Sequence, residues 1–323
     1  MRDFVVVITG ASSGIGRATA VAFARKGCAV VLAARRQEAL EAVARTCGDQ
    51  RGGDALVVPT DVTDAEAVEN LARQARQRFG RIDVWVNAAA VTAFGPFLGV
   101  PLEDFRKVLD VNVMGYVHGA RAALRVMREQ GNGTLVNVSS VLGVASQPYT
   151  HAYGMSKYAV RALSASLRQE LRLDGAKHIH VCTVLPATID TPLLAHAANY
   201  TGRTPVAMSP VYSPERVART IVALARKPRR EVVVGPMGRP LVLLSRLTPG
   251  PLERVMARTS DKGQLSRTEP APAGPGNLHS PAPGQGAVHG GWGGRRRTAT
   301  RRLAAATALA GVLVGVSRRV RPR

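Results

Sequence analysis

The sequence predicts an α/β protein built on a doubly wound, seven-stranded parallel sheet with helices on both faces. Between residue 3 and about residue 235, short runs rich in β-branched residues alternate with segments of helix length, as expected when each strand is followed by a crossover helix. The runs are almost continuously apolar and do not alternate with polar residues, which is typical of strands buried on both faces.

The expected strands can be placed one by one along the chain. They are FVVVIT (4–9), AVVLAA (29–34), ALVVPT (55–60), IDVWVN (82–87), TLVNVSS (134–140), IHVCTVLP (179–186) and EVVVG (231–235). The opening MRDFVVVITG lacks the long apolar region and the small-residue cleavage site of a signal peptide, so we interpret it as the first strand.

The composition changes after the last expected strand. Residues 1–258 are predicted to form one catalytic domain, with 240–258 as a helical appendage. Residues 259–302 are dominated by Gly, Pro, Arg and Ser and are predicted to be a disordered linker, because such a stretch buries too little apolar surface to offset ordering.

Residues 303–323 hold a 14-residue apolar run, Leu303 to Val316, between arginine pairs. A membrane-spanning helix needs about 20 apolar residues, so the run is too short to span. Two interpretations stay open: a marginal or disordered tail, and a shallow anchor on anionic lipid.

The formal net charge is +22, which by itself suggests polyanionic partners. Arginine supplies 38 of the 44 basic residues, the charge is spread along the chain, and no nucleic-acid-binding motif accompanies it, so nucleic acid is not predicted as a partner. The three cysteines are far apart and the histidines show no ligand spacing, so we predict neither a disulfide nor a metal site, and a cytoplasmic location.

A glycine-rich turn follows the first expected strand and opens an amphipathic helix. Gly10, Gly14 and Gly16 are spaced as GxxxGxG. In this context Gly10 permits the tight turn, Gly14 lets the backbone approach a pyrophosphate, and Gly16 allows the helix to pack closely on the sheet. The free amides and positive dipole end of the helix would face the phosphates, so a dinucleotide site on a Rossmann fold is predicted.

The end of the second strand indicates which dinucleotide. An acidic residue at this point bonds the ribose 2′-hydroxyl of NAD, whereas an arginine accommodates the 2′-phosphate of NADP. The chain has Ala34, Arg35 and Arg36 here. We therefore predict NADP(H) over NAD(H), with Arg35 as the principal phosphate partner and Arg36 as the second.

Tyr153 and Lys157 lie four residues apart in a helical stretch, so their side chains share one face. An ammonium in that position favours the phenolate and is expected to lower the pKa of Tyr153 toward the pH at which a general acid/base works best. His151, just before this pair, is expected either to cap the helix or to line the substrate pocket.

Together these motifs resemble the short-chain dehydrogenase/reductase family in its compact TGxxxGxG and YxxxK form, over roughly residues 3 to 235. The match includes "DV" at 61–62, "VNV" at 111–113, a serine 13 residues before Tyr153, and "LPATIDTP" after the sixth strand. The resemblance implies the catalytic residues Asn112, Ser140, Tyr153 and Lys157. It implies a cofactor site of Thr9, Gly10, Ser12, Ser13, Gly14, Ile15, Gly16, Arg35, Arg36, Asp61, Val62, Asn87, Ala88, Ala89, Tyr153, Lys157, Pro186, Thr188 and Thr191.

The family implies the role of each catalytic residue. Tyr153 exchanges a proton with the substrate oxygen, Lys157 lowers the tyrosine pKa and bonds the nicotinamide ribose, Ser140 polarises the substrate oxygen, and Asn112 holds a water. The chain departs from the family where NNAG reads NAAA and where Ala187 replaces a glycine. Loss of the second asparagine is expected to remove hydrogen bonds between the central strands, and Ala90 implies a backbone without positive φ.

The segment from Thr191 to Pro214 is expected to act as a substrate lid. It is mostly apolar and contains Tyr200, Met208 and Tyr212, and Phe94 and Phe97 are expected at the entrance, which favours a lipophilic ketone or secondary alcohol. Alternatives are a 3-oxoacyl carrier-protein reductase and a non-catalytic NADP-sensing or membrane-tethered protein. The resemblance also implies a homodimer or homotetramer paired through helices near 104–129 and 150–172.

Overall fold

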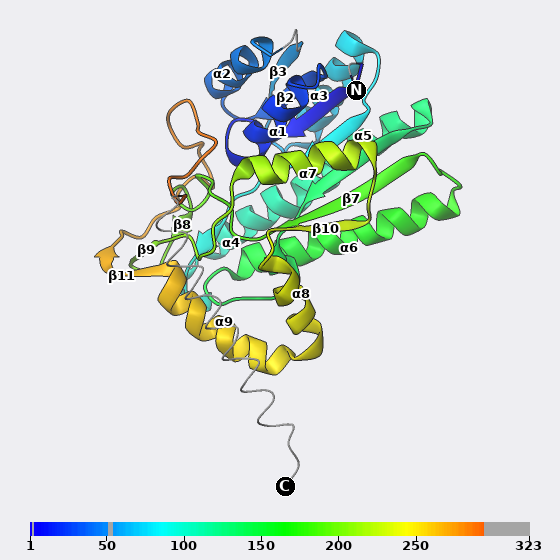
Figure 1. Cartoon of the computed structure of the whole chain (residues 1–323). Helices are drawn as coiled ribbons and strands as arrows, with labels where there is room; N and C mark the ends of the chain where they lie inside the picture. Colours follow the sequence, from blue (N-terminus) through cyan, green and yellow to red (C-terminus); the bar gives the residue numbers. More distant parts are fainter. Residues whose placement is uncertain (2, 51–53, 294–323) are drawn as a thin grey trace.

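A seven-stranded parallel sheet forms the centre of the protein, as predicted (Figure 1). The computed structural model describes residues 1, 3–50 and 54–293. The strand order is β10-β7-β6-β4-β1-β2-β3. The strands are β1 Val5–Thr9, β2 Ala29–Ala34, β3 Ala55–Pro59, β4 Val84–Asn87, β6 Gly133–Val138, β7 Ile179–Pro186 and β10 Glu231–Val234.

Helices cover both faces of the sheet because neighbouring residues of each strand point to opposite sides. In β1, Val5 and Val7 pack with one apolar cluster, whereas Val6 and Ile8 pack with the other. The first cluster includes residues of α3 (Ala65–Phe79), α5 (Gly115–Gln130) and α6 (His151–Leu173). The second includes residues of α1 (Gly14–Ala24), α2 (Gln37–Gly48) and α7 (Pro214–Arg226).

The strand order reverses between β1 and β4. The chain builds outward from β1 through β2 and β3, and then continues on the other side of β1 with β4, β6, β7 and β10. In an open α/β sheet, ligands bind in the crevice beyond the carboxyl ends of the strands at such a reversal. This position is where the predicted site residues gather.

Short elements lie around that crevice. They are β5 (Ala93–Phe94), α4 (Leu102–Leu109), a π-helical turn (Asp110–Met114), 3₁₀ turns at Phe97–Gly99 and Val141–Gly143, β8 (Ala198–Asn199) and β9 (Arg203–Pro205). β5 pairs with β8, so the predicted lid is tied to the loop that follows β4.

Buried polar side chains tie the central strands together. The Asn87 Nδ2 donates to Asn137 Oδ1 at 2.9 Å, linking β4 to β6, and the Trp85 Nε1 donates to Asn87 Oδ1 at 2.8 Å. Asn137 in turn donates to Ser164 Oγ of α6 at 3.0 Å. These bonds join β4, β6 and α6 although Ala88 replaces the family's second asparagine. Ala90 has no positive φ, as predicted.

The chain beyond β10 is helical over the expected appendage, as predicted, and forms further structure in the stretch that was expected to be a disordered linker. It forms α8 (Gly238–Leu247), α9 (Pro249–Gln264) and β11 (Leu265–Pro270), so α9 continues six residues past the expected boundary at 258. Specific contacts hold it: β11 pairs with β9, Arg203 forms an ion pair with Asp261 at 2.8 Å, and Leu278 is fully buried. The composition of the segment indicates only how much apolar surface the segment itself contains. It did not predict this order, because most of the contact partners lie elsewhere in the chain.

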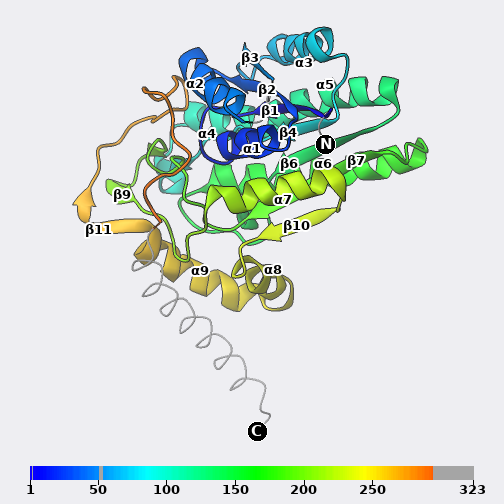
Figure 2. The same cartoon turned by 45° about the horizontal axis from the view of Figure 1, so that its top comes forward.

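Residues 271–293 follow β11 and run back along the crevice toward the start of α1 and α2, drawn in orange in Figures 1 and 2. Of the predicted linker and apolar tail, residues 294–323 lie outside the described residues. Among the helices that the structure describes, none is both long and apolar enough to cross a membrane.

Candidate active site

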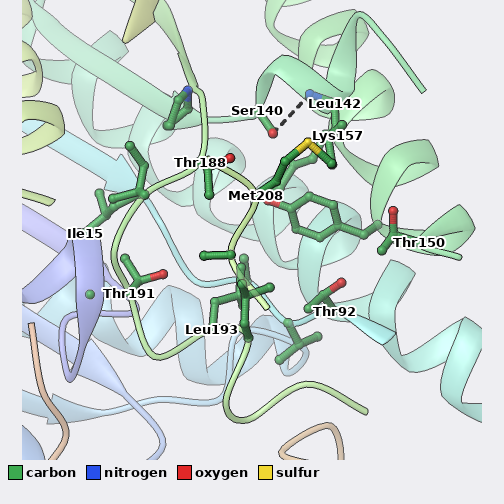
Figure 3. Close-up of a pocket in the computed structure, with 18 of the residues that line it drawn as sticks. Ile15, Thr92, Ser140, Leu142, Thr150, Lys157, Thr188, Thr191, Leu193 and Met208 are labelled. Carbon is green, nitrogen blue, oxygen red and sulfur yellow. Dashed lines mark hydrogen bonds between the residues drawn. The ribbon is translucent and has the colours of Figure 1, made fainter. Parts of the chain in front are cut away.

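A cavity of about 1510 Å³ opens at the carboxyl ends of the strands. Its wall contains most of the predicted site residues: Gly10, Ser12, Ser13, Gly14, Ile15, Gly16, Arg35, Arg36, Asp61, Val62, Ala88, Ala89, Ser140, Tyr153, Lys157, Pro186, Thr188 and Thr191. Three predicted residues, Thr9, Asn87 and Asn112, are not part of the wall. Figure 3 shows Ser140, Lys157, Thr188 and Thr191 around this space.

Ser140 is held against α6 by a close turn. The Val141–Gly143 turn begins at Ser140, whose Oγ accepts a hydrogen bond from the Leu142 amide at 3.1 Å (Figure 3). The Ser139 Oγ donates to the Lys157 carbonyl at 2.8 Å. A Cβ on Gly143 would lie 2.6 Å from that same carbonyl, so only glycine permits this approach. The contacts place Ser140 beside Tyr153 and Lys157.

Lys157 is buried, with 1% of its surface exposed. Its Nζ donates to the Val138 carbonyl at 3.0 Å and lies 5.2 Å from the centroid of the Tyr116 ring and 5.3 Å from that of Tyr153. Burial lowers the pKa of Lys157 to about 7, because the charged ammonium loses its water. The Lys157 amine and the Tyr153 phenol therefore both lie in low-dielectric surroundings.

The pKa of Tyr153 differs from the prediction. Burial raises the pKa of the phenol to about 12, and the Ser140 hydroxyl opposes the shift only in part. The prediction that Lys157 lowers this pKa below its ordinary value is wrong for this structure, because desolvation penalises the phenolate more than its neighbours favour it. The fully buried Tyr116, whose hydroxyl donates to the Val138 carbonyl at 2.9 Å, has a raised pKa for the same reason.

The Asn112 side chain is bonded entirely within the protein. Its Oδ1 accepts from the Val91 amide and its Nδ2 donates to the Val91 carbonyl, both at 2.9 Å, and Nδ2 also donates to Ser156 Oγ at 3.1 Å. Both amide hydrogens are thus used. In this structure the side chain fixes the π-helical turn to the loop after β4 and to α6, and it positions other groups without facing the cavity.

Thr9 and Asn87 also act behind the cavity wall. The Thr9 Oγ1 accepts from the Ala88 amide at 3.2 Å and the Ala89 amide at 3.4 Å. Asn87 links β4 to β6 as described above. Both residues hold the loop after β4, which forms part of the cavity wall. In this structure they therefore support the site from behind and do not line the cavity.

Hydrogen-bond donors converge at the amino end of α1. Gly10 has φ of +70°, and a Cβ there would lie 2.7 Å from the Ala89 Cα, so the turn requires glycine. Ser13 precedes α1 and makes no side-chain capping bond. The amide of Gly14 donates to the carbonyl of Ala287 at 2.8 Å.

Arg35 and Arg36 lie on the same side of the cavity. Arg35 donates from Nη2 to the Asn277 carbonyl at 2.8 Å, and burial lowers its pKa while Asp61 opposes that shift. Asp61 itself accepts bonds from the Thr63 amide and hydroxyl at 2.9 and 2.8 Å. The arginines, the Gly14 amide and the α1 amino end therefore form a positive region that takes oxygen acceptors.

The cavity wall also has a large apolar part, although Arg258 and Lys262 of α9 line the cavity as well. The apolar residues include Phe94, Leu142, Met208, Leu241, Leu244, Leu252, Val255 and Met256. Of the predicted entrance and lid residues, Phe94 and Met208 line the cavity, whereas Phe97 is 63% exposed and packs against His151. Tyr200 bonds Asp104, and Tyr212 accepts from the Met237 amide at 3.3 Å, so both stabilise the lid instead.

Several residues that build this site were not predicted from the sequence. Gln147 bonds Gln264 at 2.7 Å across the entrance, α8 and α9 supply much of the apolar wall, and residues 277–292 cover the donor-rich end. Tyr116 and Arg17 were missed as well. No local motif signals them, because their roles depend on contacts between parts of the chain far apart in sequence.

Comparisons with known proteins agree with this geometry. Residues 4–200 match the family model for short chain dehydrogenases, and the chain belongs to the short-chain dehydrogenase/reductase family of oxidoreductases. The uncharacterized oxidoreductase YxnA of Bacillus subtilis is 38% identical over 260 residues, which cover 80% of this chain and 72% of that protein.

Two solved structures have the same fold. A short-chain dehydrogenase/reductase from Burkholderia phymatum in complex with NAD has a TM-score of 0.70 at 28% identity and covers 77% of this chain and 95% of its own. An alcohol dehydrogenase from the archaeon Thermococcus sibiricus, complexed with 5-hydroxy-NADP, has a TM-score of 0.62 at 28% identity, covering 72% and 95%.

Proposed function

We propose that this protein is an NADP(H)-dependent reductase or alcohol dehydrogenase acting on a lipophilic ketone or secondary alcohol. One observation carries the proposal: a single cavity joins a donor-rich groove, containing Arg35 and Arg36, to Ser140, Tyr153 and Lys157 and then to an apolar end. Membership of the family indicates the class of reaction. The part of the cavity with the arginines favours NADP(H) as the cofactor, and the apolar part favours a lipophilic substrate.

The groove fits a dinucleotide with a 2′-phosphate. The Gly14 amide and the Arg35 and Arg36 guanidinium groups already bond carbonyl oxygens, which stand in for phosphate oxygens. No carboxylate stands at residues 34–36, where an acidic residue would favour NAD. The bound cofactor would supply the hydride, and the chain supplies position and electrostatics.

The proton transfer falls to residues on the cavity wall. The Tyr153 phenol, protonated at neutral pH because its pKa is about 12, donates its proton to the carbonyl oxygen of the substrate during reduction. The Ser140 Oγ accepts from the Leu142 amide, and its hydroxyl, which bonds Tyr153 in this structure, would turn its hydrogen to polarise that oxygen. In the reverse direction Tyr153 takes the proton from the alcohol.

Lys157 supports this step from behind. In its protonated form, its Nζ uses one hydrogen on the Val138 carbonyl, and the other two are available to ribose hydroxyls and to the developing phenolate. A buried ammonium stabilises a neighbouring anion more strongly than one in water does. Asn112 contributes by holding the π-helical turn and α6 in register.

The apolar end of the cavity favours a lipophilic substrate. Leu241, Leu244 and Leu252 from α8 and α9 line it, and burial of apolar surface would supply most of the binding energy. We also propose a homodimer or homotetramer paired through α5 and α6, because the exposed Met155 and Tyr158 of α6 and Met114, directly before α5, suit a helix interface. Light scattering of the purified protein would measure its mass and test that assembly.

The function is tested by following nicotinamide absorbance with NADPH or NADH and a panel of ketones, aldehydes and acyl thioesters. We expect turnover of hydrophobic ketones with NADPH, and slower turnover with NADH. Turnover confined to acyl thioesters would favour a 3-oxoacyl reductase, and tight NADPH binding without turnover of any substrate would contradict an enzymatic role.

A further inference from the structure

One segment of the chain covers the groove that the proposed function assigns to the cofactor. Residues 277–292, here called the strap, lie beyond β11 and are joined to the domain mainly through their own backbone carbonyls and amides. Leu278, which is fully buried, anchors its start. The strap contacts the groove at three places in succession.

The first contact is at the arginines. The Arg35 Nη2 donates to the Asn277 carbonyl at 2.8 Å, and its Nη1 donates to the Leu278 carbonyl at 3.2 Å. Arg36 donates to the carbonyls of Pro283, at 3.2 Å, and Gly284. The strap thus uses both guanidinium groups that we assign to the 2′-phosphate.

The second contact is at the glycine-rich turn. The Gly14 amide donates to the Ala287 carbonyl at 2.8 Å, and the Arg17 Nη1 donates to the Gly286 carbonyl at 2.9 Å. Gly286 lies so close that a Cβ on it would be 2.3 Å from the Ser12 carbonyl oxygen. The strap therefore lies directly on the turn that would receive the pyrophosphate.

The third contact is beside Thr188 and Thr191. The Asp190 carboxylate, 6% exposed as a residue, accepts from the Gly290 amide at 3.0 Å and the Trp292 amide at 2.8 Å. His289 also reaches this carboxylate, at 3.2 Å. Trp292 lines the cavity, so the strap extends from the arginines to the end assigned to the nicotinamide.

We propose that the strap is a built-in competitor for the dinucleotide, which NADP(H) must displace in order to bind. This inference rests on the proposed function, since it takes the groove to be the cofactor site. The Gly14 amide and the two arginines cannot bond carbonyls of the strap and phosphates of a cofactor at the same time in this arrangement. Binding of the cofactor and release of the strap are therefore coupled. The measured affinity is the affinity of the open groove multiplied by the fraction of molecules in which the strap is released.

The strap lowers the affinity for both dinucleotides by the same factor, because it must leave before either one binds, so the discrimination between them comes from the groove. The carbonyl oxygens of the strap are neutral, whereas a 2′-phosphate offers charged oxygens that form stronger bonds with guanidinium groups. The 2′-phosphate of NADPH would offer charged oxygens to Arg35 and Arg36 once the strap has left. NADH has no phosphate at this position, so its binding leaves those arginines without equivalent partners.

Gly286→Val in the full chain tests the proposal, because the added side chain clashes with the Ser12 carbonyl and expels the strap without changing any residue of the groove. Gly274→Ala is the matched control, since a Cβ there meets nothing within 4 Å and its φ is not positive. Isothermal titration would give the Kd of NADPH and NADH for each form. Hydrogen exchange would follow the Gly290 and Trp292 amides.

The strap predicts that both amides are protected in the wild type and the control, that NADPH removes this protection, and that G286V binds NADPH about tenfold more tightly. Equal Kd values in all three forms, or protection that increases with NADPH, would overturn the strap and leave the proposed function standing. If NADPH and NADH bind none of the forms, the cofactor assignment fails and the strap proposal fails with it.

Discussion

The catalytic residues of the cavity and the C-terminal segment that covers it are held in different ways. At the carboxyl edge of the sheet, the side chains of Ser140, Tyr153 and Lys157 are placed by β6 and α6, and each has its own contact with the backbone or a neighbour. Residues 238–293, by contrast, close the cavity mainly with apolar side chains of α8 and α9 and with the backbone of the strap. We propose that the first region determines the chemistry and that the second determines access to it.

The largest effect is expected at Tyr153. Tyr153→Phe removes the proton donor and keeps the ring, so kcat should fall by about 10³-fold or more while NADPH still binds. Tyr158→Phe on the same helix is the matched control, since its hydroxyl bonds the Val144 carbonyl outside the cavity. Steady-state kinetics with the best ketone of the panel would check both variants, and retained turnover in Y153F would remove the tyrosine from the mechanism.

The next largest effect is a difference in unfolding free energy between a variant in the sheet and a variant in the C-terminal segment. Asn87→Ala leaves the buried Trp85 Nε1 without its acceptor and breaks the bond between β4 and β6, so we expect a loss of about 2 to 3 kcal/mol of unfolding free energy. Gln264→Ala removes a partly exposed bond to Gln147 and should cost about 1 kcal/mol or less. Urea denaturation measures both, and equal losses would contradict the distinction.

A smaller effect is expected on cofactor choice. Arg35→Ala removes a charge-assisted partner of the 2′-phosphate, so the preference for NADPH over NADH in kcat/KM should fall about tenfold. Arg25→Ala, at an exposed arginine that directly follows α1, serves as a charge control. An unchanged preference in R35A would show that Arg35 does not choose the cofactor.

A pH dependence of stability is expected as well. The pKa of Lys157 falls from 10.5 to about 7 on folding, so between these values the unfolded chain holds a proton that the folded chain lacks. Raising the pH from 7 toward 9 should therefore increase stability by up to about 1.4 kcal/mol per pH unit, and the benefit is absent below pH 7.

Lys157→Met should abolish this contribution, whereas Lys177→Met, at an exposed position, should preserve it. Urea unfolding of the three proteins at several pH values below about 9 avoids titration of the thiols, whose pKa burial raises from 9.0 to about 11 in the folded protein. A slope in K157M equal to that of the wild type would show that another group is responsible.

The sheet was predictable because continuous apolar runs and intervening helices leave few arrangements, and the strand count and parallel order are confirmed. The placement of Ser140, Tyr153 and Lys157 in one cavity followed from motif spacing. The side chains of Thr9, Asn87 and Asn112 proved to be supports, because sequence spacing shows proximity and not which way a side chain points.

The contacts of the C-terminal region could not be predicted from the sequence, for a physical reason. Every residue of the strap has a carbonyl, so a Gly- and Pro-rich composition contains no sign of the bonds that Arg35, Arg36 and Gly14 make to it. The pKa of Tyr153 was also mispredicted, because helical spacing reveals the nearby ammonium but not the burial that outweighs it.

We propose that one cavity brings a nicotinamide cofactor to the proton donor Tyr153. A direct test is to supply NADPH that carries two deuterium atoms at nicotinamide C4, together with the best ketone of the panel, and to analyse the product by mass spectrometry. We predict that the wild type forms product with one deuterium on the carbinol carbon and that Y153F forms almost no product. A product formed without deuterium, or equal amounts of labelled product from both proteins, would contradict this proposal.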